Sequence, residues 1–355
     1  MAGLTTTTGR RSTVFSEQYR PAPIAGEFAH KHIITVEQFD RADLQALFPI
    51  AGRLRERVIN GDRSLLEICA GKVMATLFYE ASTRTDMSFQ TAMHRLGGAV
   101  ISTSGGVQFS SVYKGENLAD TVRAVGCYAD VIVLRHPDVG SSFEAAYYLD
   151  QLKGRLGGNT VVVSGGDGIG EHPTQALLDL FTIVDFKHSL DNLHITMVGD
   201  LRYGRTVHSL AKLIGRYGAH NTRISLVSPP ALQMPENIVK YAIDNGIQIY
   251  QTEDLQEVLA ETDVIYWTRI QEERFANRAD YEAIAGHFIM TPPVLARAKA
   301  DAILMHPLPR KHEMGSQDDH DVLDADSRSI YFHQMQNGMY VRMALLAKVL
   351  GASDV

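Results

Sequence analysis

The amino-acid sequence predicts an α/β protein of two domains, each with a mainly parallel sheet flanked by helices. Its 355 residues exceed the roughly 100–200 residues of a usual single domain. Short runs rich in β-branched residues alternate with segments of helical periodicity, which is typical of parallel sheets. The alternation occurs in two series, joined by an apolar helical segment at 172–186. Length and pattern together therefore favour two α/β units in tandem.

The first series begins with a helix that starts at Asp40 and ends near Asn60. Asp40 can cap this helix, and apolar residues from Leu44 to Val58 recur at helical spacing. Buried strands are expected at 72–79, 99–103, 131–135 and 160–163. Helices are expected near 85–96, 118–129 and 143–152. Residues 1–29 lack such patterns, so we expect a flexible N-terminal tail there.

The second series follows the joining helix, where Pro173 stands at a first-turn position that tolerates proline. Strands are expected near 195–198, 223–227, 248–251, 264–267 and 303–305. Helices are expected at 206–217 and 255–260, and the segment 339–350 is a strongly amphipathic helix. In open α/β sheets ligands bind beyond the carboxyl ends of the strands, so the loops after these strands are the place to seek chemistry.

The composition excludes several classes of function. Hydrophobic residues make up 45% and charged residues 21% of the chain, and no apolar run reaches the length of about 18 residues that a membrane helix needs. The net charge of −7 argues against a partner bound through nucleic-acid phosphates. Cys69 and Cys127 both lie in apolar surroundings, where buried, reduced thiols are expected. A cytoplasmic location fits, although Arg and Thr residues in the tail leave an organellar transit segment open.

The segment after the first strand has the residues of an anion site. Ser82, Thr83, Arg84 and Thr85 form a hydroxyl-rich turn that leads directly into a helix. Free backbone N–H groups at a helix N-terminus attract anions, and the guanidinium adds to them. A plain Ser/Thr cap beside a solvated arginine explains the same string equally well.

Two later loops carry further polar groups. Arg135 ends one strand, and the glycine-rich stretch 165–175 with His172 and Gln175 follows the next. A histidine at a helix start can donate a hydrogen bond to a carbonyl oxygen, although a lone histidine is more often structural. The glycine spacing also suggests a dinucleotide site, as in an NAD-dependent dehydrogenase, but no ribose-binding acid follows at the right distance.

Arginines recur at the exits of strands, in a chain that is acidic overall. The segment 199–206 (GDLRYGRT) matches a P-loop except that Arg205 replaces the lysine, so a nucleotide triphosphatase is disfavoured. Arg205 is better suited to pair with a carboxylate. The other arginines at or just after the ends of predicted strands are Arg84, Arg135, Arg269 and Arg310. A substrate with several negative charges accounts for the whole set.

No group of residues has the ligand spacing of a metal site. The acidic stretch 318–321 (DDHD) is interpreted as a solvated loop. The amphipathic C-terminal helix is interpreted as core packing. Chemistry without a metal or cofactor is the simplest hypothesis.

These motifs, in this order, resemble the aspartate carbamoyltransferase family, catalytic chain, over nearly the whole sequence from about residue 30. They are 78–85, 114–116, 134–137, 168–175, 197–210, 268–271 and 306–310. The resemblance implies a homotrimer of two-domain subunits that transfers the carbamoyl group of carbamoyl phosphate to the amine of L-aspartate. It also implies a carbamoyl-phosphate-binding domain at 30–173 plus 332–355, with the C-terminal helix packing back on it, and an aspartate-binding domain at 174–331.

The resemblance also implies roles for individual residues. Groups that bind carbamoyl phosphate would be Ser82, Thr83, Arg84, Thr85, Arg135, His172, Gln175, Leu308 and Pro309. Groups that bind aspartate would be Lys114, Arg205, Arg269 and Gln271. Groups contributed by a neighbouring subunit would be Ser110 and Lys114. The catalytic groups among these would be Arg84, Thr85, Lys114, Arg135 and His172.

The sequence departs from the family pattern at two places. Asp86 stands where many relatives have a second arginine, and the stretch 314–329 is a few residues longer than usual. Two alternatives within the fold stay open. A related transferase specific for ornithine would need a partner for a basic side chain, whereas the matching loops here offer Arg205, Arg269 and Gln271. A non-catalytic scaffold would usually have lost some of the ligand positions.

Overall fold

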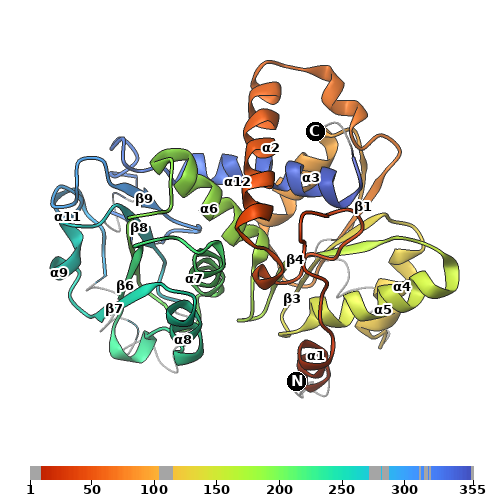
Figure 1. Ribbon diagram of the computed structural model, residues 1–355, viewed down its shortest axis with the longest axis horizontal. Coiled ribbons are helices and arrows are strands. Elements are labelled where there is room, and N and C mark those ends of the chain that lie inside the picture. The colour runs from red at the N-terminus through yellow and green to blue at the C-terminus, as the bar shows by residue number, and fades with distance from the viewer. Residues whose placement is uncertain are drawn as a thin grey trace. The chain divides into compact units, whose positions relative to one another are not determined.

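The computed structural model describes residues 9–103, 115–271, 281, 288–311, 313–315, 319 and 321–352 (Figure 1). The chain divides into two compact units, the first comprising Met1–Thr174 with Asn337–Val355 and the second Gln175–Gln336. From the sequence we expected divisions after residues 173 and 331. Both observed divisions fall inside helices, α6 (Pro173–Lys187) and α12 (Tyr331–Val349).

The first unit contains a parallel sheet in the order β2-β1-β3-β4. Its strands are β1 (Val73–Phe78), β2 (Ala99–Ser102), β3 (Val131–His136) and β4 (Val161–Asp167). Its helices include α2 (Arg41–Ile59), α3 (Thr83–Arg95), α4 (Leu118–Gly126) and α5 (Ser141–Leu156). Because the strands are parallel, the loops after β1, β3 and β4 leave the same edge of the sheet.

Local sequence signals explain where the first long helix begins. Asp40 accepts a hydrogen bond from the backbone N–H of Asp43 at 2.9 Å, and Asp43 accepts one from the N–H of Asp40 at 3.0 Å. This reciprocal capping satisfies two donors that the helix itself leaves unpaired. The expected cap at Asp40 is confirmed.

The N-terminal segment differs from the flexible tail that we expected over residues 1–29. Helix α1 (Gly9–Gln18) packs against α5, where the ring centroids of Phe15 and Tyr147 lie 5.1 Å apart (Figure 1). Farther along, Ile24 and Phe28 are buried. The expectation therefore does not hold for the described part of this segment. Its apolar residues are spaced too irregularly to give a helical signal, yet they bury aromatic and aliphatic surface in tertiary contacts.

The C-terminal helix contributes its second half to the first unit. Every residue from 340 to 347 is buried, so the strongly amphipathic helix expected at 339–350 is instead apolar on nearly all sides. The backbone carbonyl of Val349 accepts a hydrogen bond from the N–H of His30 at 2.9 Å. The side chain of Asn337 accepts one from Arg55 at 3.1 Å. Residues near both ends of the chain thus complete one core, as the predicted return of this helix to the first domain requires.

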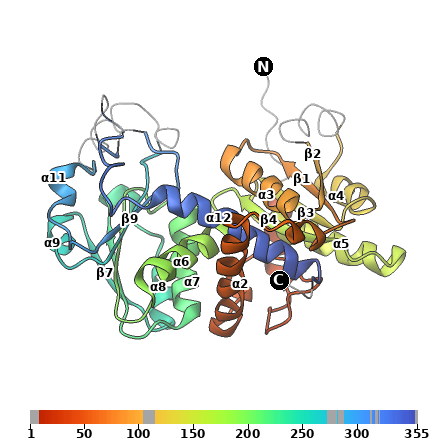
Figure 2. The same cartoon turned by 90° about the horizontal axis from the view of Figure 1, so that it is seen from above.

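The second unit contains a parallel sheet in the order β7-β6-β5-β8-β9. Its strands are β5 (His194–Val198), β6 (Arg223–Val227), β7 (Gln248–Thr252), β8 (Val264–Trp267) and β9 (Ile303–Met305). Its other helices include α7 (Arg205–Tyr217), α8 (Glu236–Asp244), α9 (Gln256–Leu259) and α11 (Pro292–Leu295). Figures 1 and 2 both show α6 and α7 on one side of this sheet and α9 and α11 on the other.

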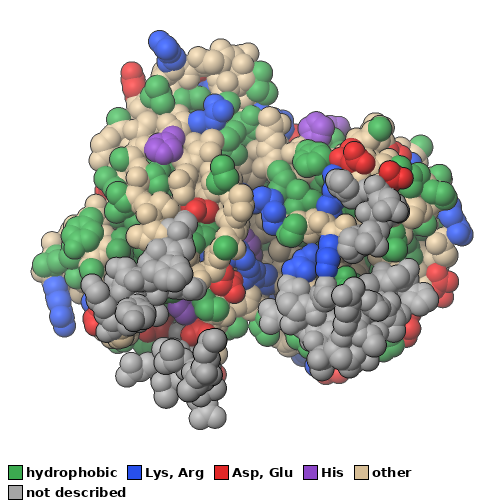
Figure 3. All heavy atoms as spheres, turned by 180° about the vertical axis from the view of Figure 1, so that it is seen from behind, with side chains coloured by type: hydrophobic (Ala, Val, Ile, Leu, Met, Phe, Trp, Pro, Cys, Tyr) green, Lys and Arg blue, Asp and Glu red, His purple; other side chains and the backbone are tan. Residues whose placement is uncertain are grey.

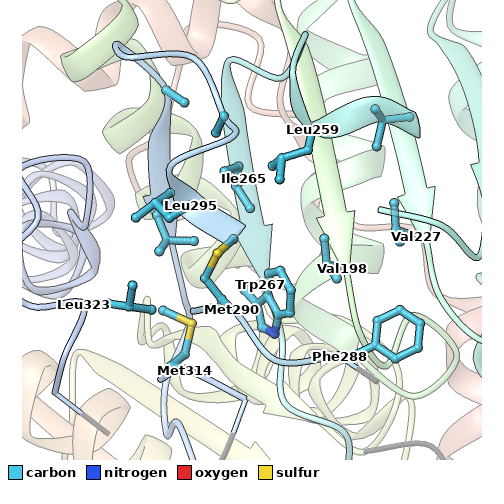
Figure 4. Close-up of a cluster of buried hydrophobic side chains, with 14 of the residues drawn as sticks. Val198, Val227, Leu259, Ile265, Trp267, Phe288, Met290, Leu295, Met314 and Leu323 are labelled. Atoms are coloured by element: carbon cyan, nitrogen blue, oxygen red, sulfur yellow. The ribbon is translucent and has the colours of Figure 1, made fainter. Parts of the chain in front are cut away.

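A hydrophobic core on one face of this sheet explains its strand pattern. Trp267 is 1% exposed and lies beside Met290 and Met314 (Figure 4). The inner strands β5 and β8 are both buried along their whole length. Strand β8 (VIYW) is a continuous apolar run, as expected of a buried parallel strand, whereas β5 (HITMV) also contains His194 and Thr196. Two units with parallel sheets and flanking helices confirm the predicted fold class.

Two further expectations can be compared with the structure. Among the described residues, none of the helices combines the length and the apolar character needed to cross a bilayer. Cys69 is buried, and burial raises the pKa of its thiol to about 12. Cys127 is exposed, so the expectation of burial is wrong for this residue. It lies at the end of α4, where its apolar neighbour Tyr128 is itself 68% exposed, so apolar neighbours in the sequence did not indicate burial here.

Candidate active site

The predicted anion cradle lies at the start of α3 in the first unit. Ser82 is the N-cap residue, but its side chain makes no capping hydrogen bond with the helix. Thr83 and Arg84 are exposed, whereas Thr85 is only 6% exposed. A helix of 13 residues presents free N–H groups and the positive end of its dipole at this point. The anion-binding interpretation requires that the hydroxyl of Ser82 is not used to cap the helix, and the structure agrees with this requirement.

Asp86 lies in the first turn of the same helix and is 9% exposed. Its carboxylate accepts a hydrogen bond from the side-chain amide of Gln90 at 2.8 Å. An acid in the first turn interacts favourably with the helix dipole and reduces the positive potential that an anion meets. The presence of Asp86 in place of an arginine therefore lowers the positive potential at the anion cradle, but it removes none of the hydrogen-bond donors there.

His172 comes next to Thr85 in space although 87 residues separate them. The distance between Thr85 Oγ1 and His172 Nε2 is 3.3 Å, and the histidine is 3% exposed. The loop before it is held by Asp167, whose carboxylate accepts hydrogen bonds from the backbone N–H groups of Gly140 and Glu171, both at 2.9 Å. A braced loop thus presents His172 at the edge of the sheet where the cradle lies.

Arg135, at the end of β3, belongs to the same edge. Its guanidinium donates to the carbonyl oxygen of Gly165 at 3.2 Å, and its Nε lies 3.6 Å from a carboxylate oxygen of Glu80. Two neighbouring loops therefore fix its direction. The sequence-predicted residues Ser82 to Thr85, Arg135 and His172 lie on loops that leave one edge of the first sheet.

The glycine-rich stretch after β4 has a structural explanation. Gly168 has a φ of +48°, and a Cβ atom added there would lie 2.4 Å from the carbonyl oxygen of Pro137. At Gly170 an added Cβ would lie 2.6 Å from the carboxylate of Asp167. Gly168 is thus required by close packing against the loop after β3, and Gly170 by close packing within its own stretch, so the dinucleotide interpretation loses its support.

The second unit brings its own polar loops together. Arg205 begins α7 after β5, while Arg269 and Gln271 follow β8. These strands are paired, with Val198 opposite Trp267. Gly199 has a φ of +113°, and a Cβ there would lie 2.2 Å from the carbonyl oxygen of Thr268. The glycine therefore allows the two loops to touch.

Asp200 holds these loops in place, and the sequence analysis missed it. Its carboxylate accepts hydrogen bonds from the side chain of Gln271 at 3.1 Å and from the backbone N–H of Tyr203 at 3.0 Å. The residue is 0% exposed, and burial raises the pKa of its carboxyl group. Its position directly after a buried strand could have indicated a role for Asp200. The sequence analysis compared this segment with a P-loop, a motif in which that position has no assigned role.

The loop after β9 carries Leu308 and Pro309, which are joined by a cis peptide bond. Leu308 has a φ of +55°, and its backbone N–H donates to His306 Nδ1 at 2.8 Å. Arg310 in the same loop is bound to Asp324, with 2.8 Å between Nη2 and Oδ2. The inclusion of Arg310 among the arginines that meet a polyanionic substrate is therefore corrected: its charge is neutralised within the protein.

Some expected features lie outside the described residues. Ser110 and Lys114 fall in the undescribed segment 104–114. Residues 316–318 and 320, which belong to the acidic stretch 318–321 and to the longer segment 314–329, are also undescribed. Within the described part of the chain, there is no cluster of three or more His, Cys, Asp or Glu that could hold a metal ion. Figure 3 shows Lys and Arg side chains on the surface of each unit, although acidic residues outnumber basic ones in the chain.

Comparison with known proteins agrees with this arrangement. The chain is 44% identical over 325 residues to the aspartate carbamoyltransferase catalytic subunit of Methanocella arvoryzae, covering 91% of this chain and 98% of that protein. Residues 31–185 match the aspartate/ornithine carbamoyltransferase carbamoyl-P binding domain, and residues 191–349 match the Asp/Orn binding domain. The chain belongs to the aspartate/ornithine carbamoyltransferase family.

Other members of this family differ in length. The multifunctional protein CAD of Squalus acanthias is 48% identical over 91% of this chain, but the match covers 14% of that protein. Among solved structures, aspartate transcarbamoylase from Trypanosoma cruzi in complex with carbamoyl phosphate and aspartate has a TM-score of 0.82. It is 39% identical, and the match covers 94% of this chain and 100% of that one. The resemblance inferred from motifs is thus confirmed at the level of the family.

Proposed function

We propose that this protein is an aspartate carbamoyltransferase. It transfers the carbamoyl group of carbamoyl phosphate to the amine of L-aspartate and releases N-carbamoyl-L-aspartate and phosphate. The observation that carries the proposal is the convergence of Arg205, Arg269 and Gln271 at one edge of the second sheet. Two guanidinium groups suit the two carboxylates of aspartate, and they disfavour the cationic side chain of ornithine.

The first unit is proposed to bind the phosphoryl end of carbamoyl phosphate. The start of α3 supplies free N–H groups, hydroxyls and the guanidinium of Arg84. Arg135, Thr85 and His172 would donate to the carbonyl oxygen, because their loops leave the same edge of the sheet. Gln175, Leu308 and Pro309 would contact the carbamoyl group from the second unit. Residues 30–173 with 332–355 thus form the proposed carbamoyl-phosphate domain, and 174–331 the aspartate domain.

The proposed reaction needs no metal or redox group. The amine of aspartate attacks the carbonyl carbon, and the C=O bond becomes a C–O⁻ oxyanion in a tetrahedral intermediate. Donors fixed around that oxygen stabilise the charge as it develops. The C–O bond to phosphate then breaks, and the departing phosphate accepts the proton lost by the amine. Catalysis would rest on positioning two anionic substrates and on electrostatic stabilisation.

Assembly and cellular role follow as parts of the same proposal. The family resemblance implies a homotrimer in which Ser110 and Lys114 reach the site of a neighbouring subunit. The reaction would be the committed step of pyrimidine synthesis, in the cytoplasm. The buried thiol of Cys69 supports a reducing compartment.

A single assay tests the activity. The purified chain is given carbamoyl phosphate with either L-aspartate or L-ornithine, without added cofactor, and the ureido product and phosphate are both measured. We expect equal amounts of N-carbamoylaspartate and phosphate with aspartate, and no product above background with ornithine. Citrulline formation would establish the ornithine alternative, and no product with either amine would favour a non-catalytic homologue.

A further inference from the structure

A chain of buried hydrogen bonds in the second unit begins at the backbone of His306. Its N–H group donates to Oε1 of Gln334 at 2.9 Å. A backbone N–H can only donate, so this contact fixes which end of the Gln334 amide is the oxygen. The Nε2 of Gln334 then donates to Oδ1 of Asp179 at 2.6 Å. Gln334 and Asp179 are both 0% exposed, so no solvent competes for these groups.

The same series of buried hydrogen bonds sets the orientation of the Gln175 side chain. Because Oδ1 of Asp179 accepts from Gln334, it is an acceptor towards Gln175 as well. The nearest atom of Gln175 is its Nε2, at 2.9 Å, which is the only end of that amide able to donate. The Oε1 of Gln175 is thereby left to accept a hydrogen bond from a ligand.

Tyr266 supports the other oxygen of Asp179. Its hydroxyl lies 2.6 Å from Oδ2, and the tyrosine is fully buried. Burial and the neighbouring Asp179 carboxylate hold the pKa of Tyr266 well above its usual value, so the phenol keeps its proton and donates it. Both carboxylate oxygens therefore accept hydrogen bonds, and the carboxylate is held by α6, α12 and β8 together.

The same series of hydrogen bonds also reaches the loop that carries Leu308. The ring of His306 accepts the N–H of Leu308 at Nδ1, over 2.8 Å, so its other nitrogen, Nε2, is the protonated one. That nitrogen lies 3.0 Å from a carboxylate oxygen of Glu313. One buried network thus fixes both segments of the second unit that the proposed function assigns to the carbamoyl group.

We propose that Asp179 is a positioning residue that makes the site selective for a carbamoyl group, by turning the Oε1 of Gln175 towards the substrate's NH₂. The inference rests on the proposed function. Acetyl phosphate has a methyl group where carbamoyl phosphate has NH₂, so it cannot donate to that oxygen. A buried acceptor left without a donor costs about 1–3 kcal/mol. Transfer from acetyl phosphate, which would give N-acetylaspartate and phosphate, should therefore be strongly disfavoured.

The test compares kcat/KM for carbamoyl phosphate with kcat/KM for acetyl phosphate, at saturating aspartate. Asp179→Ala removes the carboxylate that accepts from the amide of Gln175, although the side-chain contact of Gln175 with Tyr266 remains. We expect the preference for carbamoyl phosphate to fall about tenfold or more. Asp179→Asn is the matched control. The Nε2 of Gln334 still donates towards the place of Oδ1, so the amide oxygen of the new asparagine should occupy that place. The preference should therefore stay within about twofold of the wild type.

A double variant separates positioning from general damage. Gln175→Ala alone should lower the preference as Asp179→Ala does, and Asp179→Ala added to it should lower the preference no further. A merely structural role for Asp179 would reduce both activities alike and leave the ratio unchanged, which would overturn the proposal. An equal additional loss in the double variant would overturn it too.

If Asp179→Ala does not fold, Asp179→Ser takes its place, since a hydroxyl can donate as well as accept and does not dictate the amide orientation. If neither variant folds, Gln175→Ala decides, because an unchanged preference in that variant would overturn the proposal. A wild type that forms no N-carbamoylaspartate would refute the proposed function, whereas an active wild type without preference for carbamoyl phosphate would refute this inference alone.

Discussion

The side-chain amide of Gln271 donates a hydrogen bond to the carboxylate of Asp200, with 3.1 Å between Nε2 and Oδ2. Asp200 follows β5 and Gln271 follows β8, so one contact joins the two loops that carry Arg205 and Arg269. Because Asp200 is fully buried, it acts on a ligand through the groups that it holds.

Removal of this carboxylate should weaken the binding of aspartate. Asp200→Ala leaves the amide of Gln271 and the N–H of Tyr203 without their acceptor. We expect KM for aspartate to rise roughly tenfold to a hundredfold, given about 1–3 kcal/mol for a lost buried partner. Steady-state kinetics measure this, with Asp244→Ala as a control on an exposed carboxylate. An unchanged KM would show that Gln271 needs no such anchor.

Arg84 is predicted to bind the phosphate of carbamoyl phosphate. The residue lies at a helix N-terminus inside a hydroxyl-rich turn, where the helix dipole and the guanidinium act on the same anion. Arg84→Ala should fold normally, because the side chain is exposed, and lose roughly a hundredfold or more of kcat/KM for carbamoyl phosphate. Met87→Ala, at an exposed position on the same helix, should change little. Near-normal turnover at subsaturating carbamoyl phosphate would refute the assignment.

Arg269 is predicted to act on the other substrate. It follows β8 two residues before Gln271, on the loop that Asp200 anchors. Arg269→Ala should raise the dissociation constant for aspartate, or for a non-reactive dicarboxylate analogue, by tenfold or more according to the roughly 1.5–3 kcal/mol typical of a charged hydrogen bond. The affinity for carbamoyl phosphate should change by much less. Equal losses in titrations of both ligands would contradict the division of roles between the two units.

The sequence predicted the strands and the loops that bear Arg84, Arg135, Arg205 and Arg269, because these depend on local periodicity and on the rule that ligands bind beyond strand ends. It did not predict the roles of Asp179 and Asp200. The partners that bury them, Gln334 and Tyr266 for Asp179 and Gln271 for Asp200, lie far away along the chain. An acid in a helical stripe or after a strand therefore resembles a solvated one until the fold buries it. The helix α1 was missed for the same reason, since its contacts with α5 are tertiary.

Stability at acid pH should depend on His194. This buried residue lies beside Arg223, in a pocket also lined by Glu261, Asp263 and Lys299. Burial and the charge of Arg223 lower the pKa of His194 to about 4. The unfolded chain, with a histidine pKa of about 6.5, therefore binds more protons between pH 6.5 and pH 4. The folded state is stabilised above pH 6.5, and that contribution is lost as the pH falls towards 4.

Urea unfolding at pH 7 and at pH 4.5 measures this effect. Between these values His194→Gln should lose about 1–2 kcal/mol less stability than the wild type, after allowance for solvent screening of Arg223. His220→Gln, at an exposed position in the same unit, should behave like the wild type. An identical pH dependence in His194→Gln would mean that the imidazole becomes protonated without cost in the folded protein.

The last prediction concerns sharing of the active site between subunits, as the resemblance implies for Lys114, which lies outside the described residues. The residue belongs to a polar segment between a strand and a helix, where a solvated lysine is the simpler interpretation. If the loop reaches across, Lys114→Ala and His172→Ala homotrimers should each be nearly inactive. In a mixed trimer, some interfaces join the intact Lys114 of one variant to the intact His172 of the other.

Dissociation and reassembly of an equal mixture should therefore restore about a quarter of the wild-type activity, since each site draws its two groups independently from two chains. Mass measurement must show that the recovered trimers contain both chains, and each variant taken alone through the same procedure gives the baseline. Activity that rises only in the mixture can come only from sites built by two subunits, because no single chain in it carries both residues. Verified mixed trimers that stay as inactive as their parents would place Lys114 in its own subunit's site or outside the chemistry altogether.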